Sequence, residues 1–302
     1  MLNTSPLISV VMLGDTTDVV IAESIESILR QTYTHLELLI VHTNSCVSSR
    51  RLIADWCSRD SRVRQIIAPE NQLLFNLGIA QAGGDYISFI DGKDLWPDQK
   101  LEWQLDAIVS ARATVALGHV QRFWTDADGE TYWGSVSLVP MLPTHYLSQV
   151  LMVKSEQMLN MQTALISRHL LAKDHFFAKL LCPISEWDAW LRLAASNKFV
   201  HIDRELLFSR QYMGVCEDAA QIKQRLREEL LVINRHSTFG VAGWYLKHEA
   251  KRVRYETAFI QLLDVGKTRL ALSLCSKAFW ESSLFWRVSG WQVFFRILRQ
   301  LF

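Results

Sequence analysis

Cysteine is scarce in this sequence and is not arranged in pairs. The 302 residues include five cysteines, Cys46, Cys57, Cys182, Cys216 and Cys275, and no two of them form a C-x-x-C motif. Such an odd, scattered set excludes a thiolate zinc site and a disulfide framework, and it indicates free thiols in a reducing compartment. We therefore expect a cytoplasmic protein.

Long hydrophobic runs and a basic leader are also missing. No stretch reaches the roughly 18 consecutive apolar residues that a membrane-spanning helix needs. The first apolar run, Leu7–Leu13, is short, and no Lys or Arg precedes it. We expect neither a spanning helix nor a secretory leader.

The sequence has almost no excess of charge of one sign. Lys and Arg number 32 against 31 Asp and Glu, and no nucleic-acid-binding motif is present, so no nucleic-acid partner is expected. The lack of a G-x-G-x-x-G motif excludes a dinucleotide-dependent oxidoreductase. The charge is unevenly distributed, however, because residues 219–302 contain 14 Lys and Arg against 6 Asp and Glu. Such a region is typical either of contact with an anionic surface or of ordinary solvated helices.

The first two thirds of the chain alternate apolar runs with stretches of helical periodicity. This alternation predicts an α/β domain with a mostly parallel sheet covered by helices on both faces. Ligands of such sheets bind beyond the carboxyl ends of the strands, which directs attention to residues 42–45 and 91–94. The expected strands are Leu7–Leu13, Leu36–Val41, Val63–Ile67, Tyr86–Ile90 and Phe199–Ser209, with a strand-and-turn segment at Arg112–Tyr132; the expected helices are Asp18–Arg30, Ser48–Arg59, Gln72–Gln81 and Ser185–Ala195.

From residue 217 onward only helical patterns remain, so we divide the chain into a domain of residues 1–215 and a helical C-terminal region of residues 216–302. Ala258–Phe279 has Gly266 between two amphipathic runs, which predicts a helical hairpin. Leu284–Phe302 combines three arginines and no acid with an apolar face. This pattern is typical of a helix lying on an anionic membrane surface. The same face would also suit packing on the hairpin or on a second subunit.

Three ordered segments carry a resemblance to a known family. They are SIESILRQTYTHLELLIV (24–41), NLGIAQAGGDYISFIDGKDLWPDQKLEWQ (76–104) and SEWDAWLRLA (185–194). In order and spacing they resemble the signatures of family 2 glycosyltransferases, over residues 6–212. The resemblance implies the Rossmann-like GT-A fold. It also implies transfer of a sugar, with inversion, from a nucleotide-diphosphate sugar to a glycan or lipid-linked acceptor in surface polysaccharide or lipooligosaccharide biosynthesis. Peripheral attachment to the inner face of a membrane would suit such acceptors.

The third segment implies the position of the catalytic base. The family has an acidic pair here, whose second member deprotonates the acceptor hydroxyl, and the pair aligns with Ser185 and Glu186. A positioned carboxylate is suited to this proton transfer. Glu186 is therefore the predicted base, with Asp188 as the second candidate. Alternatively, both carboxylates only stabilise the amino-terminal end of a helix.

The donor-binding positions depart from the family pattern. His42 and Thr43 stand where the family has two aspartates, so the nucleotide is not implied, and Asn44 follows them. Asn76 lies in a segment that approaches the donor in the family, and Phe75 replaces its usual arginine. Arg210 matches a basic residue of a segment that often closes over the diphosphate. We predict that His42, Asn44, Asn76 and Arg210 bind the donor, with an ordinary salt bridge as the alternative for Arg210.

The metal motif of the family, Asp-x-Asp-Asp, is altered to Asp91-Gly92-Lys93-Asp94. The resemblance implies Mg²⁺ or Mn²⁺ here, and Asp91 and Asp94 remain as ligands for weak metal binding. Lys93, however, places a cation where the second aspartate would hold the ion, which is unfavourable at close range. Lys93 can instead neutralise the leaving diphosphate itself, which predicts a metal-independent enzyme in which all three residues contact the donor. The alternative is a catalytically silent relative that acts as a partner-binding or regulatory subunit.

Overall fold

The computed structural model describes residues 5–14, 18–43, 47–69, 73–126, 130–139, 159–171, 176–177, 185–212, 218–236 and 241–281. Two predicted features, Asn44 and the terminal segment Leu284–Phe302, lie outside these residues and stay predictions. The described residues fall into two compact units, one up to residue 212 and one from residue 218.

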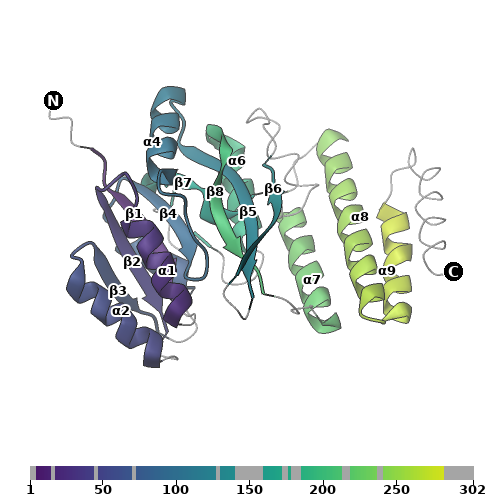
Figure 1. Cartoon of the computed structure of the whole chain (residues 1–302). Helices are drawn as coiled ribbons and strands as arrows, with labels where there is room; N and C mark the ends of the chain where they lie inside the picture. Colours follow the sequence, from purple (N-terminus) through teal and green to yellow (C-terminus); the bar gives the residue numbers. More distant parts are fainter. Residues whose placement is uncertain are drawn as a thin grey trace. The chain divides into compact units, whose positions relative to one another are not determined.

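The first unit begins with four parallel strands joined by helices (Figure 1). β1 and β2 are continuous apolar runs, and nearly every side chain in them is buried because helices cover both faces of the sheet. β1 lies between β2 and β4. The strands are β1 (Ile8–Leu13), β2 (Leu36–His42), β3 (Val63–Ile67) and β4 (Tyr86–Asp91), and the helices between them are α1 (Asp18–Leu29), α2 (Val47–Arg59) and α3 (Leu74–Gln81).

The second half of this unit extends the same sheet. The strand order is β3-β2-β1-β4-β7-β5-β6, and β8 pairs with the other side of β5. The β5–β6 hairpin corresponds to the predicted strand-and-turn segment, whereas α4 and β7 were not predicted. The elements are α4 (Lys100–Ala111), β5 (Val115–Thr125), β6 (Thr131–Ser137), the 3-10 turn η2 (Met161–Thr163), β7 (Leu165–Ser167), the 3-10 turn η3 (Arg168–Leu170), α6 (Ser185–Ser196) and β8 (Phe199–Arg210).

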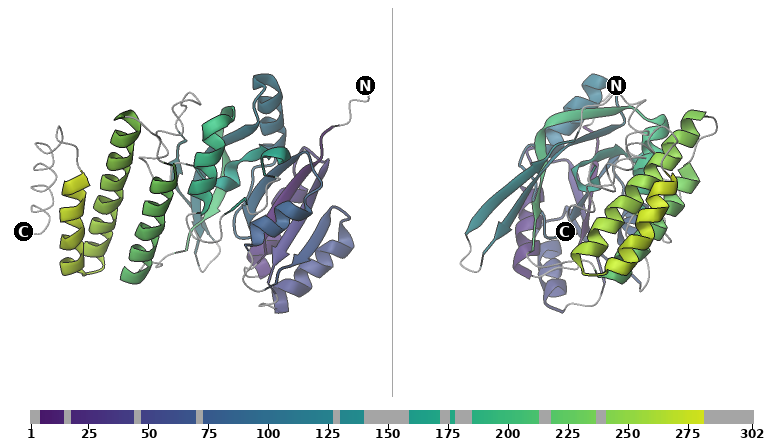
Figure 2. Two further views of the ribbon diagram at one scale, coloured as in Figure 1. Left: turned by 180° about the vertical axis from the view of Figure 1, so that it is seen from behind. Right: turned by 90° about the vertical axis from the view of Figure 1, so that its right-hand side faces the viewer.

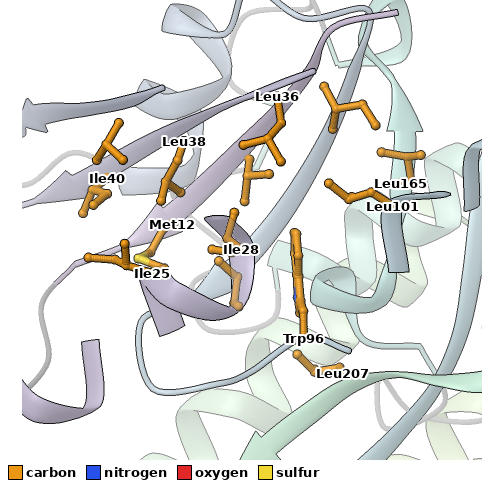
Figure 3. Close-up of a cluster of buried hydrophobic side chains, with 14 of the residues drawn as sticks. Met12, Ile25, Ile28, Leu36, Leu38, Ile40, Trp96, Leu101, Leu165 and Leu207 are labelled. Atoms are coloured by element: carbon orange, nitrogen blue, oxygen red, sulfur yellow. The ribbon is translucent and has the colours of Figure 1, made fainter. Parts of the chain in front are cut away.

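One apolar cluster joins the helices to the sheet (Figure 3). Ile25 and Ile28 of α1 lie against Met12 and Leu38 of the sheet, and Trp96 extends the cluster towards Leu101 of α4 and Leu207 of β8. All of these side chains are fully or almost fully buried. The predicted α/β class with a mostly parallel sheet is thereby confirmed.

The second unit consists, in its described part, of helices that lie side by side, α7 (Ala219–His236), α8 (Val241–Asp264) and α9 (Thr268–Glu281) (Figure 2). Its core contains Leu226, Phe259, Leu262 and Leu274. Gly266 has a φ of 72° and ends α8, where a residue without a side chain adopts the left-handed conformation without strain. None of the described helices has the length and apolar character needed to cross a membrane.

Candidate functional site at the carboxyl edge of the sheet

The strand directions bring several predicted residues to one edge of the sheet. β1, β2 and β4 are parallel, and β7 is antiparallel to both β4 and β5, so β5 and its parallel partner β8 run in the same direction as β4. The carboxyl ends of these five strands therefore lie at one edge, at Leu13, His42, Asp91, Thr125 and Arg210. This is the edge at which open α/β sheets bind ligands.

A tight turn after β4 carries the altered metal motif. The Asp94 N–H donates to the Asp91 carbonyl at 2.9 Å, and the Gly92 N–H donates to the carbonyl of Leu13 in β1 at 2.9 Å. The Lys93 ammonium nitrogen lies 3.7 Å from Oδ2 of Asp91, and both side chains are about one third exposed. Asp91 and Lys93 thus form a partly exposed charge pair at the edge.

Asp94 faces the opposite way, into the protein. Its side chain accepts a hydrogen bond of 2.8 Å from the backbone N–H of Arg210, and the residue is only 1% exposed. Burial raises the pKa of the Asp94 carboxyl to about 7, and the neighbouring Asp91 charge adds to this. The Arg210 hydrogen bond and the Lys93 charge oppose the rise without cancelling it.

Arg210 fastens this turn to two other elements. Its Nε donates to the Lys93 carbonyl at 3.1 Å, and one terminal nitrogen donates to the Thr125 hydroxyl at 2.9 Å. The other terminal nitrogen forms a salt bridge with Glu23 of α1, and the guanidinium stacks on Phe123 at 4.7 Å from the ring centroid. The structure therefore shows the salt bridge foreseen as the alternative, with the backbone of the turn as a further partner.

These side chains do not by themselves form a divalent-ion site. In the described parts of the chain no three His, Cys, Asp or Glu side chains lie close enough together to hold a metal ion. Asp94 is committed to the Arg210 backbone, and the Lys93 ammonium stands beside the remaining carboxylate of Asp91. The loop offers a charge pair rather than a set of oxygen ligands.

The two candidate bases differ in environment. Glu186, in the first turn of α6, is partly exposed, and its Oε2 accepts a long hydrogen bond of 3.4 Å from the Met161 N–H. Asp188 is fully buried and pairs with Arg192, with 3.0 Å between Oδ2 and Nε. Only a carboxylate that a ligand can reach can take a proton from it, so the geometry favours Glu186.

Sequence reasoning missed the turn η2, which connects the two halves of the site. The side chain of Gln162 accepts a hydrogen bond of 2.9 Å from the Asp91 N–H, and the neighbouring Met161 N–H is the donor to Glu186. The Asn160 side chain caps this turn by accepting from the Gln162 N–H at 2.8 Å. An Asn five residues before a short apolar strand is a weak signal for such a cap, and it was not recognised.

His42 and Asn76 take up different roles at this edge. His42 is 2% exposed, and its Nδ1 donates to the Thr43 carbonyl at 2.8 Å, so Nε2 is an acceptor, with no partner among the described residues. The Asn76 amide pairs twice with the backbone of Phe177, at 2.8 and 2.9 Å, and so ties α3 to that residue. A donor contact by either residue stays a prediction.

Exposed aromatic rings lie at the same edge. Tyr132 and Trp133 at the start of β6 are 46% and 56% exposed, and Tyr132 stacks on Trp124 of β5. Tyr212 is 55% exposed, and its ring centroid lies 6.0 Å from the Lys93 ammonium. Trp187 and Trp190, in contrast, are buried in α6, as expected of packing residues.

Comparison with known proteins agrees with this architecture. Residues 18–164 match the family model described as Glycosyl transferase family 2. Among curated proteins, an uncharacterized glycosyltransferase of Haemophilus influenzae is 32% identical over 38% of this chain and 47% of its own length. WfgD of Escherichia coli, a UDP-Glc:α-D-GlcNAc-diphosphoundecaprenol β-1,3-glucosyltransferase, is 28% identical over 38% and 46%. The chain spans about half the length of the curated relatives that it matches.

Solved structures share the fold over most of the chain. S. aureus TarS 1-349 in complex with UDP-GlcNAc superposes with a TM-score of 0.63 at 12% identity, covering 92% of this chain and 82% of that one. A mannosyltransferase from Pyrobaculum calidifontis, solved with GDP-Man and Mn²⁺, gives 0.57 at 11% identity, covering 98% and 81%. At these identities the likeness shows the fold.

Proposed function

We propose that the protein, whose residues 18–164 match the model of glycosyl transferase family 2, is a nucleotide-sugar-dependent glycosyltransferase. In this proposal it transfers a sugar, with inversion, to a glycan or lipid-linked acceptor in surface polysaccharide or lipooligosaccharide biosynthesis. One observation carries the proposal. The Asp91–Lys93 pair and the Glu186 carboxylate are joined through a single turn, η2, at the edge where such folds bind ligands.

The proposed reaction is a single displacement. The acceptor hydroxyl oxygen attacks the anomeric carbon of the donor while Glu186 takes the hydroxyl proton. The bond from that carbon to the diphosphate oxygen breaks, and the nucleoside diphosphate leaves with the electron pair. Attack from the face opposite the leaving group inverts the anomeric configuration.

Lys93 supplies the positive charge that the departing diphosphate needs. Its ammonium group is partly exposed at the edge and 3.7 Å from Asp91, which holds it near the end of β4. A fixed cation aimed at developing negative charge does the electrostatic work that a divalent ion does in related sites. The proposed enzyme is therefore metal-independent.

His42 and two exposed aromatic rings are further candidates for contact with the substrates. His42 lies at the end of β2, at the edge where the donor is proposed to bind. The exposed rings of Tyr132 and Trp133 offer apolar faces of the kind on which a sugar ring of the acceptor packs. Attachment to an anionic membrane through Leu284–Phe302 belongs to the same proposal and awaits a vesicle-binding measurement.

Substituting Glu186 by Gln tests the catalytic proposal. The variant keeps the shape of the side chain but cannot take a proton, so we expect the turnover of the preferred nucleotide sugar to fall by about 10²–10⁴-fold. Its affinity for the donor should stay within a small factor of that of the wild type. Nucleoside diphosphate release and donor binding are the two measurements.

Glu26→Gln, an exposed position on α1, is the matched control and should keep full activity. A Glu186→Gln variant that turns over at the wild-type rate would rule out Glu186 as the base. A wild-type protein that binds no donor would favour the silent, partner-binding relative. Two observations favour this second function: Asp94 is buried, and Asp91 is paired with Lys93.

A further inference from the structure

A lysine is buried in the core of the first unit, and no carboxylate of the described residues pairs with it. Lys100, at the start of α4, is 0% exposed. Its ammonium nitrogen donates to the Ser88 hydroxyl at 3.0 Å and to the Gln104 side-chain oxygen at 2.7 Å, and it lies 4.0 Å from the ring centroid of Trp96. Burial lowers the pKa of Lys100 well below its usual range. A methionine would fill the same volume without this desolvation cost, so the polar contacts need an explanation.

Both hydrogen-bond partners of Lys100 hold the same end of the turn η2. Ser88, on β4, donates its hydroxyl hydrogen to the Ala164 carbonyl at 2.6 Å. The amide nitrogen of Gln104 donates to the Thr163 carbonyl at 2.8 Å and to a carbonyl of β5 at 3.1 Å. Because each of these groups uses its donor on a carbonyl, its oxygen is left to accept from Lys100. Lys100 thus fixes the orientation of both.

The opposite end of η2 contacts the proposed catalytic groups. Gln162 binds the Asp91 N–H at 2.9 Å, and the Met161 N–H points at the Glu186 carboxylate at 3.4 Å. Residues 161–164 are consecutive, so the hydrogen bonds from the core and those to the site act on one short rigid segment. The distance between the donor-binding turn and the base therefore depends on where the core network places η2.

We propose that Lys100 is a positioning residue for transfer: through Ser88 and Gln104 it fixes the turn Met161–Thr163, and this turn sets the spacing between the Asp91–Lys93 pair and Glu186. The inference rests on the roles given to these residues in the proposed function. Lys100 touches neither donor nor acceptor in this account. Its effect reaches the reaction only through Gln162 and Met161.

A double-mutant cycle tests whether Lys100 acts through the turn Met161–Thr163. Lys100→Met removes the network's donor at similar length, and Gln162→Met removes the contact to the Asp91 N–H. Release of nucleoside diphosphate is followed with UDP-glucose, UDP-GlcNAc and GDP-mannose, using the donor that turns over fastest. We expect each single variant to lose about 10–100-fold in kcat, the range that misplacement of reacting groups produces. The KM for the donor should change less than about threefold, as expected for groups that position rather than bind.

The double variant should be no slower than the slower single variant, because both substitutions break one pathway. If the two losses multiply, Lys100 acts independently of Gln162 and the proposal is wrong. Ile28→Ala, a buried α1 position that makes no side-chain hydrogen bond, is the control for general destabilisation and should keep its kcat. An equal loss of kcat in Ile28→Ala would also overturn the proposal.

Amide hydrogen exchange supplies a readout that does not need activity. Lys100→Met should speed exchange at the amides of Asp91 and Met161 while the amides of α7–α9 keep their protection. Unchanged exchange rates at the amides of Asp91 and Met161 would contradict the proposed positioning role of Lys100, even in a protein without turnover. Should Lys100→Met not fold, Ser88→Ala removes one link and should show the same local loss in milder form. Failure to bind or turn over any donor would instead count against the proposed function alone.

Discussion

At the scale of single residues, Asp94 is a carboxyl group buried at the edge of the sheet, where its ionised form is disfavoured. The carboxyl is nearly inaccessible, and burial raises its pKa to about 7, from an ordinary value of 3.8. Below about pH 4 the group is protonated in both the folded and the unfolded protein, and its full contribution to stability is present. As the pH rises through 7 the folded protein must accept a buried charge, so this contribution is lost.

Asp94→Asn removes this titrating group, so the free energy of unfolding should depend less on pH in the variant than in the wild type. Between pH 5 and pH 8 the wild type should lose about 3 kcal/mol of unfolding free energy relative to the variant, at 1.36 kcal/mol for each pH unit of differing protonation. The asparagine oxygen can still accept from the Arg210 N–H. Urea unfolding at pH 5, 6, 7 and 8 measures the difference, and all other titrating groups cancel between the two proteins. Parallel profiles would show that Asp94 is already ionised in the folded state near pH 5.

Sequence predicted those residues of the site that belong to contiguous motifs. Lys93 and Asp94 follow the fourth strand as predicted, since the apolar run before them is unambiguous, whereas Asp91 is the last residue of that strand. The partners of Arg210 were out of reach, because Glu23 and Thr125 lie 187 and 85 residues away along the chain. Contacts over such distances depend on the strand order, which periodicity does not encode.

At the scale of elements, the strands with long apolar runs were predicted almost to the residue. β2 ends at His42 rather than Val41, and β8 at Arg210 rather than Ser209. β7 and η2 were missed because each is three residues long, too short to show a period. α4 was not predicted, although Leu101, Leu105 and Ile108 have helical spacing that would have revealed it. The part of the site that sequence missed is therefore the part built on these short elements.

The packing of α3 on β1 depends on a glycine. A Cβ at Gly78 would lie 2.2 Å from a methyl carbon of Val11, which is fully buried in β1. On an open helix Gly→Ala is stabilising by about 1 kcal/mol, so the sign of the effect is diagnostic. We expect Gly78→Ala to lower the free energy of unfolding by about 1–3 kcal/mol, as overpacking of a core does. Chemical denaturation measures it.

The same substitution in a Val11→Ala background provides the control. Shortening Val11 makes room for the new methyl group, so Gly78→Ala should then cost almost nothing. Equal costs in both backgrounds would mean that α3 does not approach β1 in the way described.

At the scale of the whole molecule, a sheet of parallel strands brings four separate stretches of sequence to one edge. The ends of β1 and β2, the turn after β4, and the first turn of α6 all contribute residues, and η2 connects the last two. The altered motif gives this edge a partly exposed lysine–aspartate pair. We infer that this pair supports donor binding without a divalent ion.

A thermal-shift comparison shows whether donor binding needs a divalent ion. UDP-, GDP-, CDP- and dTDP-sugars are added to the wild type and to Lys93→Met, each in Mn²⁺ and in EDTA. A ligand that binds the folded protein raises the Tm by mass action. We predict that one nucleotide class raises the Tm of the wild type equally in Mn²⁺ and in EDTA, and that Lys93→Met loses this shift. A shift that requires Mn²⁺, or one that Lys93→Met retains in EDTA, would contradict the account.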